Sequence, residues 1–191
     1  QRRLGRVPKA DRPLLELAAV AGRQLDLALL GVLEQGTDLD DWLASCTGAA
    51  VLDVEGGTLR FAHDKLREGL LAQLSPSASK ALHLRVAAGI EAIHPDDPAQ
   101  TAALAHHYAM GGDAEKAAHY AGLAGEQALH SSAYREAVTF FERALSTLPA
   151  DDDEQAASSR RAPGAPSDEG ALAAAQRLAR RSLSKARALV A

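Results

Sequence analysis

The sequence predicts a mainly α-helical protein, and its composition and apolar spacing are the observations that support this fold class. Hydrophobic residues make up 47% of the 191 residues, whereas aromatic residues make up only 4%. An apolar fraction dominated by alanine and leucine favours packed helices, because strands draw on β-branched and aromatic side chains. Over most of the chain the apolar residues also recur with the helical period. The length allows one domain or two small ones.

Three short helices are predicted before residue 50. Asp11 and Pro13 mark the start of the first helix and Gly22 marks its end, and a second helix is predicted over residues 26–36. The third helix carries four apolar residues at positions i, i+3, i+4 and i+7, which places them in one stripe: Leu39, Trp42, Leu43 and Cys46.

A β-hairpin is predicted after the third helix. Two runs with strand-like alternation flank Gly56 and Gly57, and a Gly-Gly pair supplies the positive φ that a tight hairpin turn requires. Three helices followed by a hairpin are the elements of a winged helix. We assign residues 1–75 to this domain, including a helix that carries Leu66, Leu70 and Leu74 and that Ser75-Pro76 ends.

Residues 76–149 are predicted to be helical throughout and to form stacked antiparallel hairpins. The first of these helices has four apolar residues on one face: Leu82, Val86, Ile90 and Ile93. Three more helices follow. One ends at Gly111-Gly112, the next covers residues 113–129, and the last covers residues 132–148, before Pro149.

Small residues recur in these helices where two helices must approach closely, and their spacing resembles that of tetratricopeptide repeats. A Gly-Asp turn at Gly112-Asp113 fits the same pattern. The two matches lie ~20 residues apart, whereas a full repeat has ~34, so the helix from Asp113 would belong to two successive units. The predicted packing residues are Leu104, Ala105, Tyr108, Ala117, Ala124, Ala137, Phe141 and Ala144.

The two C-terminal segments differ from the rest. Residues 150–170 have almost no large apolar side chain, which predicts a disordered linker. Residues 171–191 predict a basic amphipathic helix, with a thin stripe of Leu172, Ala175, Ala179, Leu183, Ala186 and Val190. Its other faces carry Arg177, Arg180, Arg181, Lys185 and Arg187, and no acidic residue. Such a helix could contact nucleic acid or membrane, but we favour an unpartnered repeat helix.

No motif of the chain supports catalysis. There is no nucleophile elbow around a serine and no phosphate-binding loop, and Cys46 lies on an apolar stripe, where a thiol is inert. The histidines lack metal-ligand spacing, and the adjacent His106 and His107 point about 100° apart on a helix. We therefore predict no enzyme and no metal site, and expect the histidines to lie on helix surfaces.

The charge pattern argues against DNA binding. In winged helices the third helix commonly enters the major groove, yet here it carries Asp38, Asp40 and Asp41 and neither lysine nor arginine. DNA affinity comes largely from cations that neutralise phosphates. The basic residues of this region precede the first helix, as in a solvated linker: Arg2, Arg3, Arg6, Lys9 and Arg12. Nucleic acid is therefore an unfavoured partner.

The cysteine count and the absence of a targeting segment bear on the compartment. One cysteine cannot form an internal disulfide, and no run approaches the ~20 apolar residues that span a bilayer. We expect a cytoplasmic protein with no membrane partner. Because the chain starts at Gln1 with neither an initiator methionine nor a signal segment, we also expect it to be a piece of a longer polypeptide.

The run TLRFAHDKLREGLL, residues 58–71, changes its apolar period from two to nearly four at His63 and Asp64. Asp64 is predicted to cap a helix that begins at Lys65, for ~1 kcal/mol. A histidine beside a helix N-terminus directs a hydrogen-bond donor to a place where anions collect, so a phosphate contact by His63 is chemically sensible.

The order of these elements resembles a known family. A winged helix, a second wing strand containing Phe61, a His-Asp pair that opens the next helix, and tetratricopeptide-like hairpins are similar to the segment that follows the nucleotide-binding core in STAND-class signalling ATPases. These include the NB-ARC relatives and bacterial regulators joined to serine/threonine kinase, nucleotide cyclase or LuxR-type output domains. The runs HDKLRE, ALHLRVAAGIEAIHPDD and LAHHY particularly resemble the kinase- and cyclase-linked ATPases. The resemblance covers residues 1–149.

The resemblance implies a function for the His-Asp pair. In the family a Met-His-Asp motif stands here, and its histidine contacts the β-phosphate of bound ADP and holds the off state closed. By position, His63 would make this contact and Asp64 would cap and orient, while Ala62 stands where the motif has methionine. The chain would then be a non-catalytic regulatory and protein-interaction piece of a signal-transduction ATPase, with the winged helix clamping the nucleotide core.

The resemblance also implies the ligands and partners. ATP or ADP with magnesium would bind in the parent protein, and the chain alone would hold no cofactor. The expected partners are the parent's nucleotide-binding core and output domain, together with a protein or small ligand on the helical repeats. The alternative function is a DNA-binding transcription regulator with a helical effector domain.

Overall fold

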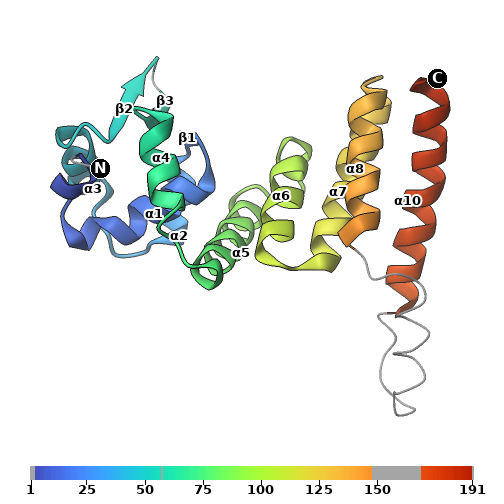
Figure 1. The fold of residues 1–191 in the computed structure, drawn as a ribbon, viewed down its shortest axis with the longest axis horizontal. Helices are drawn as coiled ribbons and strands as arrows, with labels where there is room; N and C mark the ends of the chain where they lie inside the picture. Colours follow the sequence, from blue (N-terminus) through green and yellow to red (C-terminus); the bar gives the residue numbers. More distant parts are fainter. Residues whose placement is uncertain (1–2, 57, 148–168, 191) are drawn as a thin grey trace, which may run out of the picture. The chain divides into compact units, whose positions relative to one another are not determined.

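The computed structural model describes residues 3–56, 58–147 and 169–190, and the side chains of 169–175 are not described. The chain divides into two compact units, Gln1–Pro95 and Asp96–Ala191, and each is described by itself. Both units are mainly helical, and the first also contains a small three-stranded antiparallel sheet (Figure 1).

The helices of the first unit follow the predicted order. They are the short 3-10 helices η1 (Leu4–Arg6) and η2 (Lys9–Asp11), then α1 (Arg12–Ala21), α2 (Leu27–Leu33), α3 (Leu39–Gly48), α4 (Asp64–Leu71) and α5 (Pro76–Ile93). Side-chain oxygens of Asp26, Asp38 and Ser75 accept backbone N–H groups at the starts of α2, α3 and α5. These caps satisfy donors that a helix leaves without a partner in its first turn.

Asp11 was expected to cap α1, but its side chain has a different role. Its side chain makes no cap hydrogen bond to that helix. The carboxylate instead accepts the Ser45 hydroxyl at 2.7 Å, and the Asp11 carbonyl accepts the indole N–H of Trp42 at 3.1 Å. Asp11 therefore ties the start of α1 to α3, which buries Trp42 and Cys46 as its stripe predicted.

The predicted hairpin is confirmed, with β2 (Leu52–Glu55) paired antiparallel to β3 (Thr58–Phe61). Gly56 has φ +60°, as the turn requires. A third strand, β1 (Gln24–Leu25), was not predicted and pairs with the other edge of β3, so that the sheet order is β1-β3-β2. One face of the sheet is buried through Leu25, Leu52, Leu59 and Phe61.

Helix α5 belongs to the first compact unit, whereas the sequence grouped residues 76–149 as one helical array. It packs on α1 and α2 and buries Val86 and Ile90. The approach to α2 is close at Gly89, where a Cβ would lie 2.7 Å from the Leu33 side chain and 2.8 Å from that of Leu29. The absence of a side chain at Gly89 therefore permits this contact.

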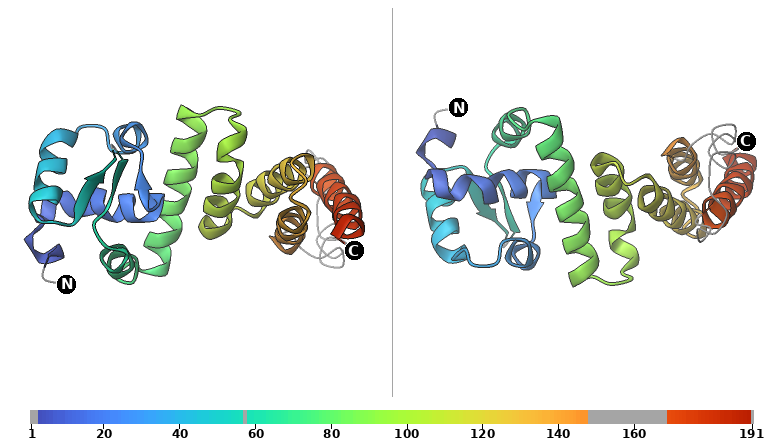
Figure 2. Two further views of the ribbon diagram at one scale, coloured as in Figure 1. Left: turned by 90° about the horizontal axis from the view of Figure 1, so that it is seen from above. Right: turned by 90° about the horizontal axis from the view of Figure 1, so that it is seen from below.

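The second unit is a series of helices packed side by side, as Figure 1 and the end-on views of Figure 2 show for α7, α8 and α10. Its elements are the 3-10 helix η3 (Pro98–Gln100), α6 (Thr101–Gly111), α7 (Ala114–His130), α8 (Tyr134–Thr147) and α10 (Glu169–Val190). Helix α7 packs on α6 and α8, and α10 packs on α8 and α7. The predicted linker lies almost wholly outside the described residues.

All the residues expected to pack the repeats are buried, none more than 7% exposed: Leu104, Ala105, Tyr108, Ala117, Ala124, Ala137, Phe141 and Ala144. Helices α7 and α8 approach closely at Gly125, where a Cβ would lie 2.6 Å from the Phe141 ring. The second unit is thus held by small side chains that let helix backbones come together around one large aromatic ring.

Helix α10 is packed into the second unit along part of its predicted stripe. Ala179, Leu183 and Ala186 are buried with residues of α7 and α8. Arg187 pairs with Glu142 of α8 at 2.8 Å. Val190, which the stripe also included, is 44% exposed. The side chains of Leu172 and Ala175 lie outside the described residues.

Candidate functional site

His63 stands between the last strand and the helix that follows it. Strand β3 ends at Phe61, α4 begins at Asp64, and His63 is the N-cap residue with an extended backbone (φ −147°, ψ 137°). Its side chain is exposed and makes no cap hydrogen bond. Nor does it form a hydrogen bond or ion pair with any residue that the structure describes. The imidazole is therefore placed at the positive end of a helix, and its donor has no hydrogen-bond partner among the described residues.

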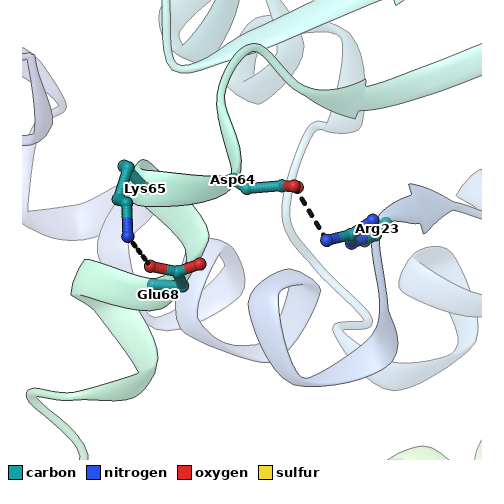
Figure 3. A network of polar contacts seen from close by, with 4 residues as sticks. All are labelled: Arg23, Asp64, Lys65 and Glu68. Atoms are coloured by element: carbon teal, nitrogen blue, oxygen red, sulfur yellow. Dashed lines mark hydrogen bonds and ion pairs between the residues drawn. The ribbon is translucent and has the colours of Figure 1, made fainter.

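The prediction that Asp64 caps α4 is wrong. The helix begins one residue earlier than expected, so Asp64 is its first residue and lies inside the first turn. Its carboxylate instead accepts the Arg23 guanidinium at 2.8 Å (Figure 3). A carboxylate in the first turn still interacts favourably with the helix dipole. The ion pair itself is exposed, 73% at Arg23 and 55% at Asp64, and such pairs contribute ~0.2–1 kcal/mol.

Further charges surround this pair on α4. Arg67 donates its Nε–H to the Ala19 carbonyl at 2.7 Å. Burial lowers the pKa of Arg67, and the positive charge of Arg23 lowers it further, so the two guanidinium groups lie within electrostatic reach of each other. Lys65 pairs with Glu68 at 2.8 Å, also drawn in Figure 3. The hydrogen bond and charge of Glu68 raise the pKa of Lys65, and those of Lys65 lower the pKa of Glu68.

The charge balance favours an anion at the start of α4. Arg23, Lys65 and Arg67 are cationic, whereas Asp64 and Glu68 are the only carboxylates among these interacting residues, which leaves one net positive charge beside His63. The helix terminus adds a partial positive charge. The arrangement can bind an anion such as a phosphate.

In the ranges that the structure covers, no group of three or more His, Cys, Asp or Glu side chains is placed to hold a metal ion. Burial, with a smaller contribution from the Asp11 carboxylate, raises the pKa of the Cys46 thiol to about 12, so this thiol stays protonated near neutral pH. Helices long and apolar enough to cross a membrane are not found within the same ranges.

The sequence analysis missed Arg23 and Arg67. Arg23 is 41 residues from Asp64 and follows Gly22 at the end of α1, where no local pattern distinguishes it. A prediction of β1 beside β3 would have brought it near, because Gln24 pairs with Arg60 in the sheet. The only sequence signal for Arg67 is that it is a cation three residues after Asp64 on the same predicted helix.

The expectation that the histidines lie on helix surfaces is wrong for His83 and His107, which are 7% and 4% exposed. His83 stands three residues before Val86 and His107 three residues after Leu104, so each shares a helix face with a buried apolar residue. The His107 ring also meets that of His106 edge to face, with centroids 5.3 Å apart.

Comparison with known proteins found no relative. No protein-family model, curated protein or solved structure matches the chain. The site at the start of α4 is therefore interpreted from its own geometry and from the resemblance in element order.

Proposed function

We propose that this chain is a non-catalytic regulatory segment of a bacterial STAND-class signal-transduction ATPase. In this proposal residues 1–75 act as a winged helix that clamps the nucleotide-binding core of the parent protein in its ADP state. The observation that carries the proposal is the exposed side chain of His63 at the start of α4, which has no hydrogen-bond partner in the part of the chain that the structure describes.

The residues at this helix start fit a phosphate group. His63 would donate a hydrogen bond to a phosphate oxygen of ADP held by the neighbouring core, and the positive end of α4 would favour the same negative charge. Arg23 adds a cation nearby but is already paired with Asp64, so its charge is partly neutralised. The His63 ring, in contrast, has an N–H donor that no described residue accepts.

The tetratricopeptide-like second unit would bind a protein or small ligand that reports on the signal. Its packing through small residues at close helix contacts supports this assignment. The alternative, a DNA-binding regulator, is disfavoured because Asp38, Asp40 and Asp41 stand at the start of α3. In a gel shift with generic duplex at physiological ionic strength, affinity weaker than ~100 μM would exclude that alternative.

The phosphate contact can be tested by ADP release from the parent polypeptide. His63→Ala should lose a charge-assisted hydrogen bond of ~1.5–3 kcal/mol, which corresponds to release of a fluorescent ADP analogue that is faster by roughly 10- to 100-fold. Lys9→Ala is the control, because it removes an exposed cation of the same unit that lies outside the charged cluster at the start of α4. It should change release by less than ~3-fold.

The same variants separate a binding role from a structural one. Because His63 is exposed and satisfies no buried partner, His63→Ala should leave the thermal midpoint of the isolated chain nearly unchanged. If His63→Ala instead lowered the midpoint and left ADP release as it was, the histidine would be structural and the proposal would be wrong.

A further inference from the structure

Helix α10 has a second stripe that the described residues of its unit leave largely exposed. Leu178, Ser182, Lys185 and Leu189 follow one another at i, i+4, i+7 and i+11, which is the spacing of one helix face. Leu178 immediately precedes the buried Ala179, so this face lies about 100° around the helix from the packed one. The two leucines are large and exposed, 55% at Leu178 and 48% at Leu189.

Cations accompany these leucines. Lys185 lies between them, and Arg181 lies on the same face, three residues after Leu178 and four before Lys185; both side chains are exposed. Residues 176–190 carry five cations in all and no acidic residue. We call Leu178, Arg181, Lys185 and Leu189 the basic leucine stripe.

A cavity continues this stripe at the end of α10. It has a volume of about 390 Å³ and lies between the first turn of α8 and the last turn of α10. Its lining includes Tyr134 and Arg135 on α8 and Leu189 and Val190 on α10. Leu189 thus belongs both to the stripe and to the cavity. The exposed Arg135 and Glu136 of the lining carry opposite charges, so the cations that face a partner are those of the stripe. The cavity can receive an apolar side chain from a partner that lies along the stripe.

We propose that the basic leucine stripe and this cavity bind an acidic amphipathic helix of a partner protein. The two leucines are ~16 Å apart along the helix axis, so a partner helix of three turns or more would cover both. Its apolar side chains would contact Leu178 and Leu189, one of them entering the cavity, and its carboxylates would face Arg181 and Lys185.

The same features disfavour the other occupants. A nucleic acid would pair with the cations but leave both leucines uncovered. A membrane would need a broad apolar face, whereas the main apolar stripe of α10, at Ala179, Leu183 and Ala186, is already buried against α7 and α8. A second copy docked through the same stripe would bring cations against cations.

The inference rests on the proposal that the second unit binds a partner, but not on the phosphate contact of His63. Fluorescence anisotropy with a labelled helical peptide tests it on the intact chain. The probe is an alanine-based helix with leucine and glutamate at the spacing of the stripe, and its twin has lysine in place of glutamate. Saturable binding of the acidic peptide, and weaker binding of the twin by at least ~10-fold, are expected.

Variants locate the binding. Arg181→Glu combined with Lys185→Glu should weaken the acidic peptide by at least ~10-fold. Arg143→Glu is the control, because Arg143 is an exposed cation on α8 that belongs neither to the stripe nor to the cavity lining, and it should change affinity by less than ~3-fold. Leu189→Ser should also weaken binding, because it removes an apolar contact with the partner side chain that enters the cavity.

Other results would overturn the inference. These are no peptide binding up to ~1 mM, or equal loss in the control and stripe variants. Competition of the peptide by a single-stranded oligonucleotide or by anionic vesicles at lower concentration would assign the face to those ligands instead. If the peptide did not bind but ADP release still depended on His63, the proposed phosphate contact would stand. If the peptide bound but ADP release did not depend on His63, only the phosphate contact would be removed.

Discussion

The cores of the two compact units are built from side chains of different size. The first unit fully buries Trp42 together with several leucines and valines, among them Leu15, Leu17 and Leu30. In the second unit Phe141 is the most deeply buried large side chain among the described residues, and most of the buried positions are alanines of α6, α7, α8 and α10.

The two units should therefore respond in opposite ways to a change of side-chain volume. In the first, large groups fill the space between a sheet and helices, so that removing atoms leaves a cavity. In the second, helix backbones approach closely because side chains are absent, so that adding atoms forces helices apart.

Trp42→Ala should destabilise the first unit by ~3–5 kcal/mol. The change removes a side chain that is 1% exposed and also leaves the Asp11 carbonyl without the indole donor. Circular dichroism should show the loss of one helical transition. All three tyrosines lie in the second unit, and without Trp42 they are the source of the protein's fluorescence. The midpoint of unfolding followed by tyrosine fluorescence should therefore stay unchanged. A matching shift in the tyrosine transition would show that the units unfold together.

Gly125→Ala should destabilise the second unit by ~1–3 kcal/mol, because the new methyl group would lie 2.6 Å from the Phe141 ring. Gly122→Ala on the same helix is the control, since a Cβ there meets nothing within 4 Å. It should stabilise the unit by ~0.5–1 kcal/mol through higher helix propensity. Chemical denaturation followed by circular dichroism compares the two, with Trp42 fluorescence reporting the first unit. Equal effects of the two substitutions would contradict the close contact.

The first unit should also lose stability in alkaline solution through Cys46. Burial first, and then the charge of Asp11, raise its thiol pKa from 9.0 to about 12. Above pH 9 the unfolded chain can release this proton and the folded chain cannot, so the free energy of unfolding should fall by ~1.4 kcal/mol per pH unit up to about pH 12. Below pH 9 this contribution is constant.

Urea unfolding of the chain and of Cys46→Ala at several pH values between 8 and 11 gives the comparison. The variant should have the shallower slope with pH, whatever its stability at pH 8. Equal slopes of unfolding free energy against pH for the two proteins would mean that the thiol has the same pKa in the folded and unfolded states. Burial of Cys46 would then not raise its pKa.

Asp64→Ala should have the smallest effect. The substitution removes an exposed ion pair with Arg23 and an acidic residue of the first turn of α4, for a loss of ~0.5–1 kcal/mol. A double-mutant cycle with Arg23→Ala measures the pair itself. Coupling above ~1.5 kcal/mol would show that the pair holds α4 in place more strongly than its exposure implies.

Much of the fold follows from local patterns in the sequence. The period-two runs around Gly56 predict β2 and β3, and the cap residues Asp26, Asp38 and Ser75 mark the starts of three helices. Strand β1 could not be predicted, because two residues are too short to show a period. The stripe of α5 predicts a buried face but not the surface against which it is buried.

At the candidate site the sequence pattern located the change from strand to helix at His63 and Asp64. It did not predict the contacts that Arg23 and Arg67 make there. The start of α4 was misplaced by one residue, which is enough to turn a cap into a first-turn carboxylate. Arg23 reaches Asp64 only through the folded arrangement of α1, β1 and β3. Contacts between residues so distant in sequence leave no trace in the local periodicity of either segment.

The packing of α5 at Gly89 sets where this chain can be divided. A polypeptide ended after Leu74 would lose the helix whose Val86 and Ile90 are buried in the first unit, and would uncover the side chains of Leu29 and Leu33 that meet Gly89. An end after Pro95 keeps that contact. A recombination point at Pro95 would therefore keep α5 together with α1 and α2, on which it packs. Helix α5 would then be inherited with the helices and sheet that precede it.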